Sequence, residues 1–159
     1  MAKQYQLDFE EEEVNELLLA IHSAFAPPKF AYWLNRELET AFVRAPEELR
    51  DSLTDIHFPL FSYCRNEEEI WYIIANKTYQ VVGKDLFGNV EKLQLLVPTL
   101  PKVDYFLRIS NYDPEEDYLS ILQAIQWIEA IYEIPILTEE GLSPKERKKI
   151  TEIKTKLIF

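Results

Sequence analysis

Cysteine, histidine and glycine are scarce in this chain, with one, two and three copies respectively among 159 residues. A single cysteine excludes a disulfide within the chain, which is typical of a reducing compartment. No His-x-x-His, His-Glu-x-x-His or Cys-x-x-Cys spacing occurs, so a dedicated zinc site is not expected. The Gly-rich phosphate loops and the Gly-x-Ser-x-Gly nucleophile motif are also absent. We therefore expect no cofactor, and common nucleotide-dependent and hydrolase chemistries are disfavoured.

Long apolar runs are absent too. None approaches the ~18 residues of a membrane-spanning helix, and residues 1–5 contain no apolar signal core. We therefore expect a cytoplasmic protein without membrane contact. Basic residues are in the minority. The chain has 17 Lys and Arg and 28 Asp and Glu, which gives a net charge of −11. This acidity argues against a general nucleic-acid binder, which needs a cationic surface.

The few reactive side chains lie apart in the sequence. Cys64 sits in an apolar run and is expected to be a small buried hydrophobe. His57 and Cys64 are seven residues apart on one predicted strand, about 23 Å, and on opposite faces, which excludes a dyad. The acidic runs 10–13 and 67–69 are expected to be solvated charge rather than a metal site, because no EF-hand spacing is present.

Alternating or aromatic-rich segments predict strands, and one segment stays ambiguous. Residues 14–25 carry apolar side chains at helical spacing, yet Leu17 to Ile21 is also a continuous run of strand length, so helix and strand both stay open. Residues 79–93 are expected to form an exposed hairpin or loop. Strands are predicted at 4–9, 42–44, 57–64, 70–75 and 103–109, with a polar hairpin loop at 65–69 and a loop at 45–55.

Three helices are predicted. The first begins at Pro28 and places Phe30, Trp33, Leu34 and Leu38 on one face. The second is long, from the Asp113-Pro114 start to about Tyr132, because Asp can cap and Pro fits the first turn. Its broad apolar face makes it a central packing element or a contact surface, and the expected contact residues are Trp127, Ile128 and Ile131.

The third helix covers about 143–157 and is basic. Ile150, Ile153 and Leu157 form a narrow apolar stripe, while half of its other residues are Lys or Arg, against only two Glu. Docking on protein, either its own acidic domain or a twin subunit, is the favoured interpretation, with Lys148 and Lys149 as electrostatic partners. Contact with RNA is the alternative.

Val97-Pro98-Thr99-Leu100-Pro101-Lys102-Val103-Asp104-Tyr105 is the most distinctive stretch. In the favoured, structural interpretation the two prolines shape a rigid approach to a core strand. Asp104 then accepts backbone N–H groups of a turn, and Tyr105 is buried with its hydroxyl bonded. In the functional interpretation, Asp104 and Tyr105 face a cleft as acid and hydrogen-bond donor.

This stretch resembles the signature of the IPExxxVDY family, small bacterial proteins of the Bacteroidetes, through Pro98, Val103, Asp104 and Tyr105. Thr99 stands where the motif has Glu, so no role of that Glu as general acid or metal ligand transfers to this chain. Further likeness lies in residues 33–35, 74–77 and 154–159. The resemblance implies no particular activity, and it favours a strand over a helix in residues 14–25.

Together these observations predict a single α+β domain over residues 1–159, a two-layer structure with a mainly antiparallel sheet and helices packed on one face. The leading functional hypothesis is a non-enzymatic protein-interaction or self-assembling domain, with a homodimer as one form. A small-molecule-binding or catalytic site near Asp104, Tyr105 and Asn35 is the second hypothesis, for an unknown ligand. RNA contact through the terminal helix is the third.

Overall fold

The computed structural model describes residues 16–136 and 141–159, and the predicted strand 4–9 and acidic run 10–13 lie outside this range. The chain order within it is β1 (Glu16–His22), α2 (Pro27–Leu38), β2 (Val43–Arg44), β3 (Leu49–Arg50), β4 (His57–Phe58), β5 (Leu60–Cys64), β6 (Ile70–Ala75), β7 (Lys77–Asp85), β8 (Gly88–Leu95), β9 (Tyr105–Ser110), α3 (Tyr118–Gln123), β10 (Ala130–Glu133) and α4 (Pro144–Leu157). No helix in the described range is long and apolar enough to cross a membrane.

Across the described residues, one six-stranded sheet forms the centre, in the order β10-β1-β9-β6-β5-β2. Every neighbouring pair in it is antiparallel, which confirms the α+β class with a mainly antiparallel sheet. β1 settles the open question in residues 14–25. Its five central residues, Leu17–Ile21, are all buried, as expected of a strand that is covered on both faces.

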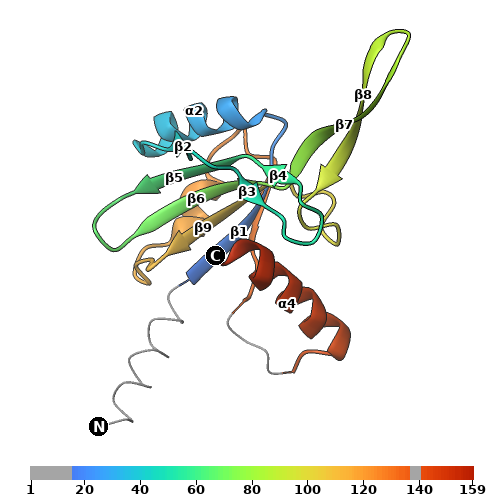
Figure 1. Cartoon of the computed structure of the whole chain (residues 1–159). Coiled ribbons are helices and arrows are strands. Elements are labelled where there is room, and N and C mark those ends of the chain that lie inside the picture. Colours follow the sequence, from blue (N-terminus) through green and yellow to red (C-terminus); the bar gives the residue numbers. More distant parts are fainter. Residues whose placement is uncertain (1–15, 137–140) are drawn as a thin grey trace.

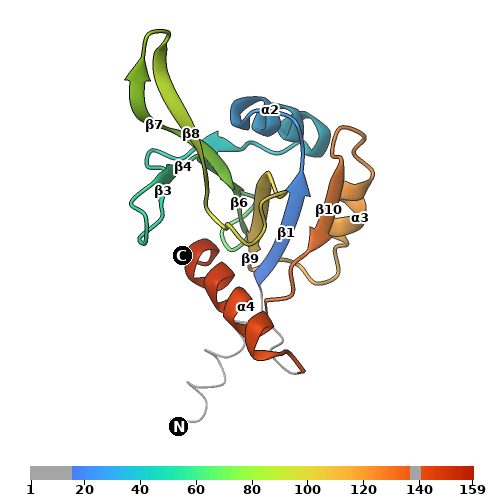
Figure 2. The ribbon, with the colours of Figure 1, turned by 90° about the vertical axis from the view of Figure 1, so that its right-hand side faces the viewer.

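Helices cover both faces of the sheet, whereas we expected them on one. Leu17, Leu19 and Ile21 of β1 pack in the cluster that contains residues of α2 and α3. Leu18 and Ala20 point the other way and pack with Ile150, Ile153 and Leu157 of α4. Figure 2 shows α2 and α4 on opposite sides of the sheet. The two-layer expectation was therefore wrong, because the central strands are apolar on both faces.

The predicted long helix at 113–132 is wrong. Only α3 is helical there, and its cap is Asp117, which accepts from the Ser120 backbone N–H at 3.1 Å. Residues 130–133 instead form β10, where Ile131 pairs with Ile21 of β1. The physical reason is that β1 would otherwise leave one row of backbone hydrogen-bonding groups without partners. Tertiary pairing overrides the helical spacing of the apolar residues.

β7 and β8 form a separate hairpin that projects from the body (Figure 1). This confirms the expected exposed hairpin at 79–93. We call residues 77–95 the arm and residues 84–89 its tip. Pro59 interrupts the predicted strand 57–64 and divides it into β4 and β5. The predicted strand at 103–109 starts later, at Tyr105, and Val103 packs in the cluster with α4 rather than beside Tyr105 and Leu107.

Candidate functional site

The motif stretch is held in place by one fully buried amide, Asn76, which directly follows β6. Its Nδ2 donates to the carbonyl oxygens of Leu100 at 3.0 Å and Val103 at 2.8 Å. Its Oδ1 accepts from the Val97 backbone N–H at 2.8 Å. Asn76 therefore uses both ends of its side chain to fix the turn between β8 and β9, in which Pro98 and Thr99 are exposed.

Asp104 and Tyr105 complete this junction. The Asp104 carboxylate accepts from the Ser23 backbone N–H at 2.9 Å and pairs with Lys77 Nζ at 2.7 Å. Tyr105 is 3% exposed, its hydroxyl donates to the Phe25 carbonyl oxygen, and burial raises the pKa of its phenol. These contacts agree with the structural interpretation of the motif, including an Asp104 bonded to a turn and a buried, bonded Tyr105.

Asn35, the third residue of the hypothetical ligand site, lies in a different hydrogen-bonded group. It closes the end of α2, where its side chain bonds to the Phe42 backbone N–H and carbonyl and accepts from the Thr40 hydroxyl. The structure therefore brings Asp104 and Tyr105 together but gives Asn35 a separate role. Both asparagines bridge backbone segments.

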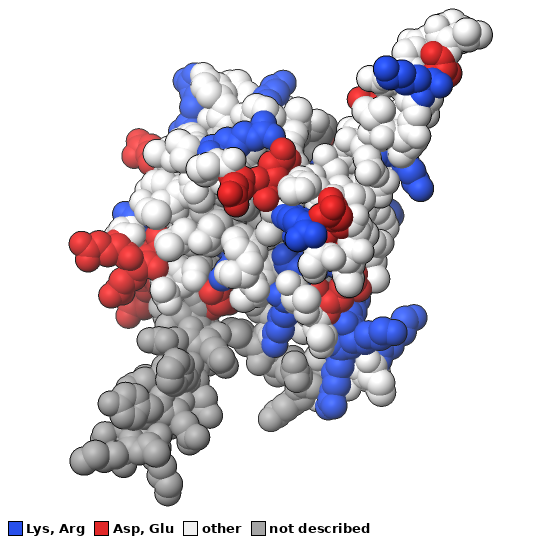
Figure 3. Space-filling model, viewed as in Figure 1, with Lys and Arg blue, Asp and Glu red and all other residues white. Residues whose placement is uncertain are grey.

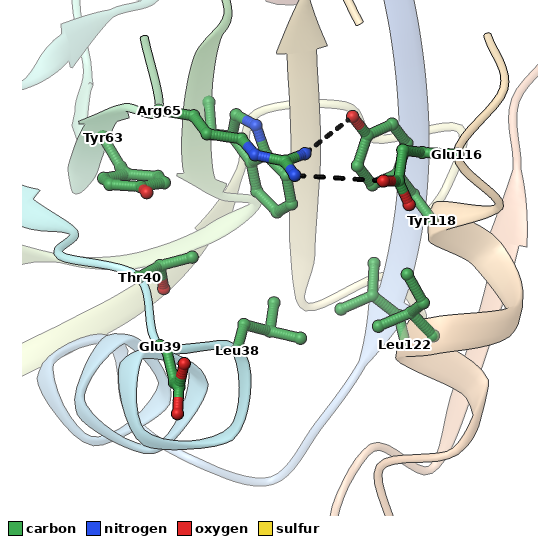
Figure 4. Close-up of a pocket in the computed structure, with 10 residues that line it drawn as sticks. Leu38, Glu39, Thr40, Tyr63, Arg65, Glu116, Tyr118 and Leu122 are labelled. Atoms are coloured by element: carbon green, nitrogen blue, oxygen red, sulfur yellow. Dashed lines mark hydrogen bonds and ion pairs between the residues drawn. The ribbon is translucent and has the colours of Figure 1, made fainter. Parts of the chain in front are cut away.

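A pocket of about 260 Å³ opens between the end of α2, β5–β6 and α3 (Figure 4). Arg65 projects into it, with Nη1 donating to the Tyr118 hydroxyl at 3.1 Å and Nη2 lying 4.0 Å from Glu116. Leu38 and Leu122 supply apolar walls. Glu39 and Glu116 also line the pocket, so it combines apolar walls with a guanidinium whose charge is already compensated by carboxylates.

Glu69 contacts two residues that line this pocket, Arg65 and Tyr118. It was missed in the sequence analysis, because residues 67–69 were treated there as solvated charge. It is 4% exposed, accepts from the Tyr118 hydroxyl and lies 3.4 Å from Arg65 Nη1. The indication in the sequence is its place beside an apolar strand that begins at Ile70. In the described part of the chain, no cluster of metal-ligating side chains occurs.

Alkaline pH should expose the contribution of Tyr118. Burial, followed by the bond to Glu69, raises its pKa from 10.0 to about 12. An unfolded tyrosine ionises first, so the stabilisation is complete below pH 10 and is lost as pH rises towards 12. We expect Tyr118→Phe to flatten the decline of unfolding free energy over this interval by up to about 1.4 kcal/mol per pH unit.

Urea unfolding at successive pH values measures this slope. Tyr79→Phe changes a hydroxyl on a side chain that is 68% exposed and serves as the control. A Tyr118→Phe slope equal to that of the wild type and of Tyr79→Phe would contradict the assignment.

The expected contact residues of the long helix are placed within the domain. Trp127 stacks on Phe25 with ring centroids 5.0 Å apart and meets Phe30 edge-on. Ile128 is 8% exposed, and Ile131 packs against the same cluster from β10. Their apolar surface thus serves the core of this chain, and the outward helix face on which they were expected does not exist.

The terminal helix carries most of its basic residues outward, but Lys156 is directed inward, where its ammonium donates to the Leu96 carbonyl oxygen at 2.6 Å and pairs with the buried Asp51. Ser143 caps the helix by accepting from the Glu146 backbone N–H at 3.2 Å. Its apolar stripe lies on the sheet of its own domain. Lys148 and Lys149 are exposed, and Figure 3 shows Lys and Arg gathered over α4. Their contact with a protein or with RNA stays a prediction.

Cys64 is exposed at the end of β5, so the expected burial is wrong. The reason is that β5 ends there, directly before the polar loop that leads to β6. His57 belongs to the two-stranded sheet β3–β4, whereas Cys64 belongs to the six-stranded sheet, as the described residues are paired.

No family model, no curated protein and no solved structure matches this chain. Membership of the IPExxxVDY family therefore stays a prediction. Two of the segments that carry the resemblance nevertheless meet in space, because Asn76 and Lys77 bond to the 97–105 stretch.

Proposed function

We propose that this chain is a protein-interaction domain that assembles with itself through the arm. The observation that carries the proposal is the exposure of two large apolar side chains at the tip, Leu86 at 98% and Phe87 at 96%. In Figure 3 the outermost end of the arm is white, with charged atoms of both signs directly below it. Further exposed apolar side chains along the arm are Tyr79, Val81, Val82, Val90 and Leu93.

Two physical arguments support an interaction role for the arm. Large exposed apolar patches on soluble proteins mark contact sites. A two-stranded hairpin is also only marginally stable by itself, so covering its side chains with a partner would stabilise it.

The base of the arm is held firmly, which suits a presented binding element. β7 begins at Lys77, whose ammonium pairs with Asp104, and β8 ends one residue before Leu96, whose N–H donates to the Asn76 carbonyl oxygen at 2.8 Å. In this proposal, the 97–105 motif contributes to function by fixing the direction in which the arm leaves the body.

Replacing the tip side chains with polar ones tests the proposal. We expect Leu86→Ser/Phe87→Ser to convert the assembly into monomers without lowering the melting temperature of the monomer, since neither side chain packs on the body. Size-exclusion chromatography with light scattering over a concentration series measures the assembly.

The matched control is Leu53→Ser, which removes an apolar side chain that is 80% exposed but lies outside the arm. It should assemble as the wild type does. A wild-type chain that is monomeric throughout the series, or a tip variant that assembles normally, would refute the proposal.

A further inference from the structure

An apolar groove lies between β10 and α4, on the other side of the sheet from α2. Its volume is about 260 Å³, and its apolar walls include Tyr132, Ile134, Pro135, Leu142, Ile150 and Ile153. Tyr132 and Pro135 are exposed at its mouth, while Ile134 and Ile153 form a buried floor. Such a surface is suited to one or two large apolar side chains rather than to a polar ligand.

The rim of the groove bears charges of both signs. Glu133 and Glu146 are exposed there, together with Lys149. Among the ion pairs found in the described residues, none involves these three side chains. The groove therefore offers an apolar floor with unpaired charges around it.

The arm tip carries the complementary arrangement. Leu86 and Phe87 form its apolar end, and Lys84 and Asp85 directly precede them in β7. Both charged residues are exposed, and no ion pair in the described range includes them. An apolar tip flanked by one cation and one anion matches an apolar groove flanked by two anions and one cation.

The arm cannot fill the groove of its own chain. Figures 1 and 2 place the arm tip and α4 at opposite ends of the molecule. A second copy in antiparallel orientation, however, brings each tip to the other copy's groove. Two such contacts related by a two-fold axis close the assembly at a dimer and leave no free tip.

We propose that the arm tip of one copy inserts Leu86 and Phe87 into the β10–α4 groove of a second copy, with Lys84 facing Glu133 and Glu146, and Asp85 facing Lys149. This inference rests on the proposed function, because it names the partner surface for the arm. The groove of each copy thus binds the hairpin of the other copy, and each dimer contains two equivalent insertions.

Reversing single charges at these exposed side chains tests the pairing. The Asp85 carboxylate also accepts from the Phe87 backbone N–H at 2.8 Å, so Lys149→Glu, which leaves that turn intact, is the primary test. We expect Lys149→Glu and Asp85→Lys each to weaken dimerisation about 3- to 10-fold, and the double variant to recover most of this loss. Lys148→Glu makes the same change one residue away, outside the groove lining, and should leave the dissociation constant unchanged.

A disulfide trap identifies the contact directly. In a Cys64→Ser background, one chain carries Asn89→Cys in the tip and another carries Leu142→Cys in the groove. Oxidising a mixture should yield mainly a cross-linked pair of the two different chains. A tip-to-tip dimer would instead link Asn89→Cys chains to one another.

The two proposals fail in different ways. If Leu86→Ser/Phe87→Ser abolishes assembly but Lys149→Glu behaves as Lys148→Glu and the mixed cross-link is missing, the arm mediates assembly and the groove assignment is wrong. If the tip variant leaves assembly unchanged, the proposed function itself is wrong and the groove inference falls with it.

Discussion

Replacing Asn76 with alanine is expected to lower the free energy of unfolding by about 3–5 kcal/mol. The substitution removes three hydrogen bonds to the backbone. The Leu100 carbonyl still accepts from the Val103 N–H at 3.2 Å, so two groups are orphaned, the Val97 N–H and the Val103 carbonyl. Asn76 is fully buried, so water cannot readily replace those hydrogen bonds. Each orphaned group costs roughly 1–3 kcal/mol, and a domain has only about 5–15 kcal/mol of stability to lose.

Asn35→Ala is the matched control, because Asn35 also makes three side-chain hydrogen bonds, but it is only half-buried. Water can reach the groups that Asn35 leaves, and we expect a loss of about 1–2 kcal/mol. Chemical denaturation measures both variants. Equal losses would show that burial does not determine the cost and would contradict the role assigned to Asn76.

Asn76→Ala should also loosen the arm before the domain unfolds. Both arm strands leave the body at this residue, since β7 begins directly after it and the β8 end is held by its carbonyl. Amide hydrogen exchange should therefore rise in residues 77–95 more than in β9. In Asn35→Ala the arm amides should exchange as in the wild type.

Local sequence patterns correctly predict an element when its caps and apolar spacing favour the same structure as its packing against the rest of the chain. α4 has a serine cap, a proline in its first turn and one apolar stripe, and the helix forms as expected. β1 was ambiguous because a strand buried on both faces has no alternation to distinguish it from a helix. Its assignment depends on α4 covering the second face, which no local pattern reveals.

The error at 113–132 has a similar origin. Apolar residues around Trp127 fit helical spacing, but α3 ends at Gln123 and the following residues turn so that β10 pairs with β1. The requirement that decided the structure belonged to β1, more than a hundred residues earlier in the chain. The local spacing of apolar residues cannot reveal that β1 needs a second neighbouring strand. Matching the possible strand partners along the whole chain could reveal it.

The candidate interaction site was partly visible in the sequence. An exposed hairpin was expected near residues 79–93, but its apolar turn was not recognised. The stretch Asp85-Leu86-Phe87-Gly88 places two large apolar residues where turns normally carry polar ones. That contrast with ordinary turn composition was the available indication of a contact surface.

Replacing Arg108 with methionine is expected to cost about 3–5 kcal/mol of stability. Arg108 is 5% exposed. Its guanidinium donates two hydrogen bonds to the Glu16 carboxylate, one from Nε at 2.9 Å and one from Nη2 at 3.0 Å. Nη1 also donates to the Phe159 carbonyl oxygen at 3.1 Å. One side chain thereby connects β9, the first residue of β1 and the C-terminal end of the chain.

Most of this cost should come from the carboxylate that Arg108 leaves behind. Glu16 would then be a largely buried charge without its cation. We therefore expect Arg108→Met/Glu16→Gln to be more stable than Arg108→Met alone, although it carries one more substitution. Arg50→Met, which breaks the exposed pair with Asp55, should cost far less than Arg108→Met, because solvent screens that pair.

Urea denaturation of the wild type, Arg108→Met, Glu16→Gln and the double variant forms a double-mutant cycle, with Arg50→Met measured beside it as the control. A strongly coupled cycle would establish that the ion pair acts as one unit which ties the two ends of the described chain to the sheet. Additive losses would show that packing of the Arg108 stem dominates instead, and equal losses for Arg108→Met and Arg50→Met would show that burial does not strengthen the pair with Glu16. The pair would then be incidental to how α4, and with it the groove, is held on the sheet.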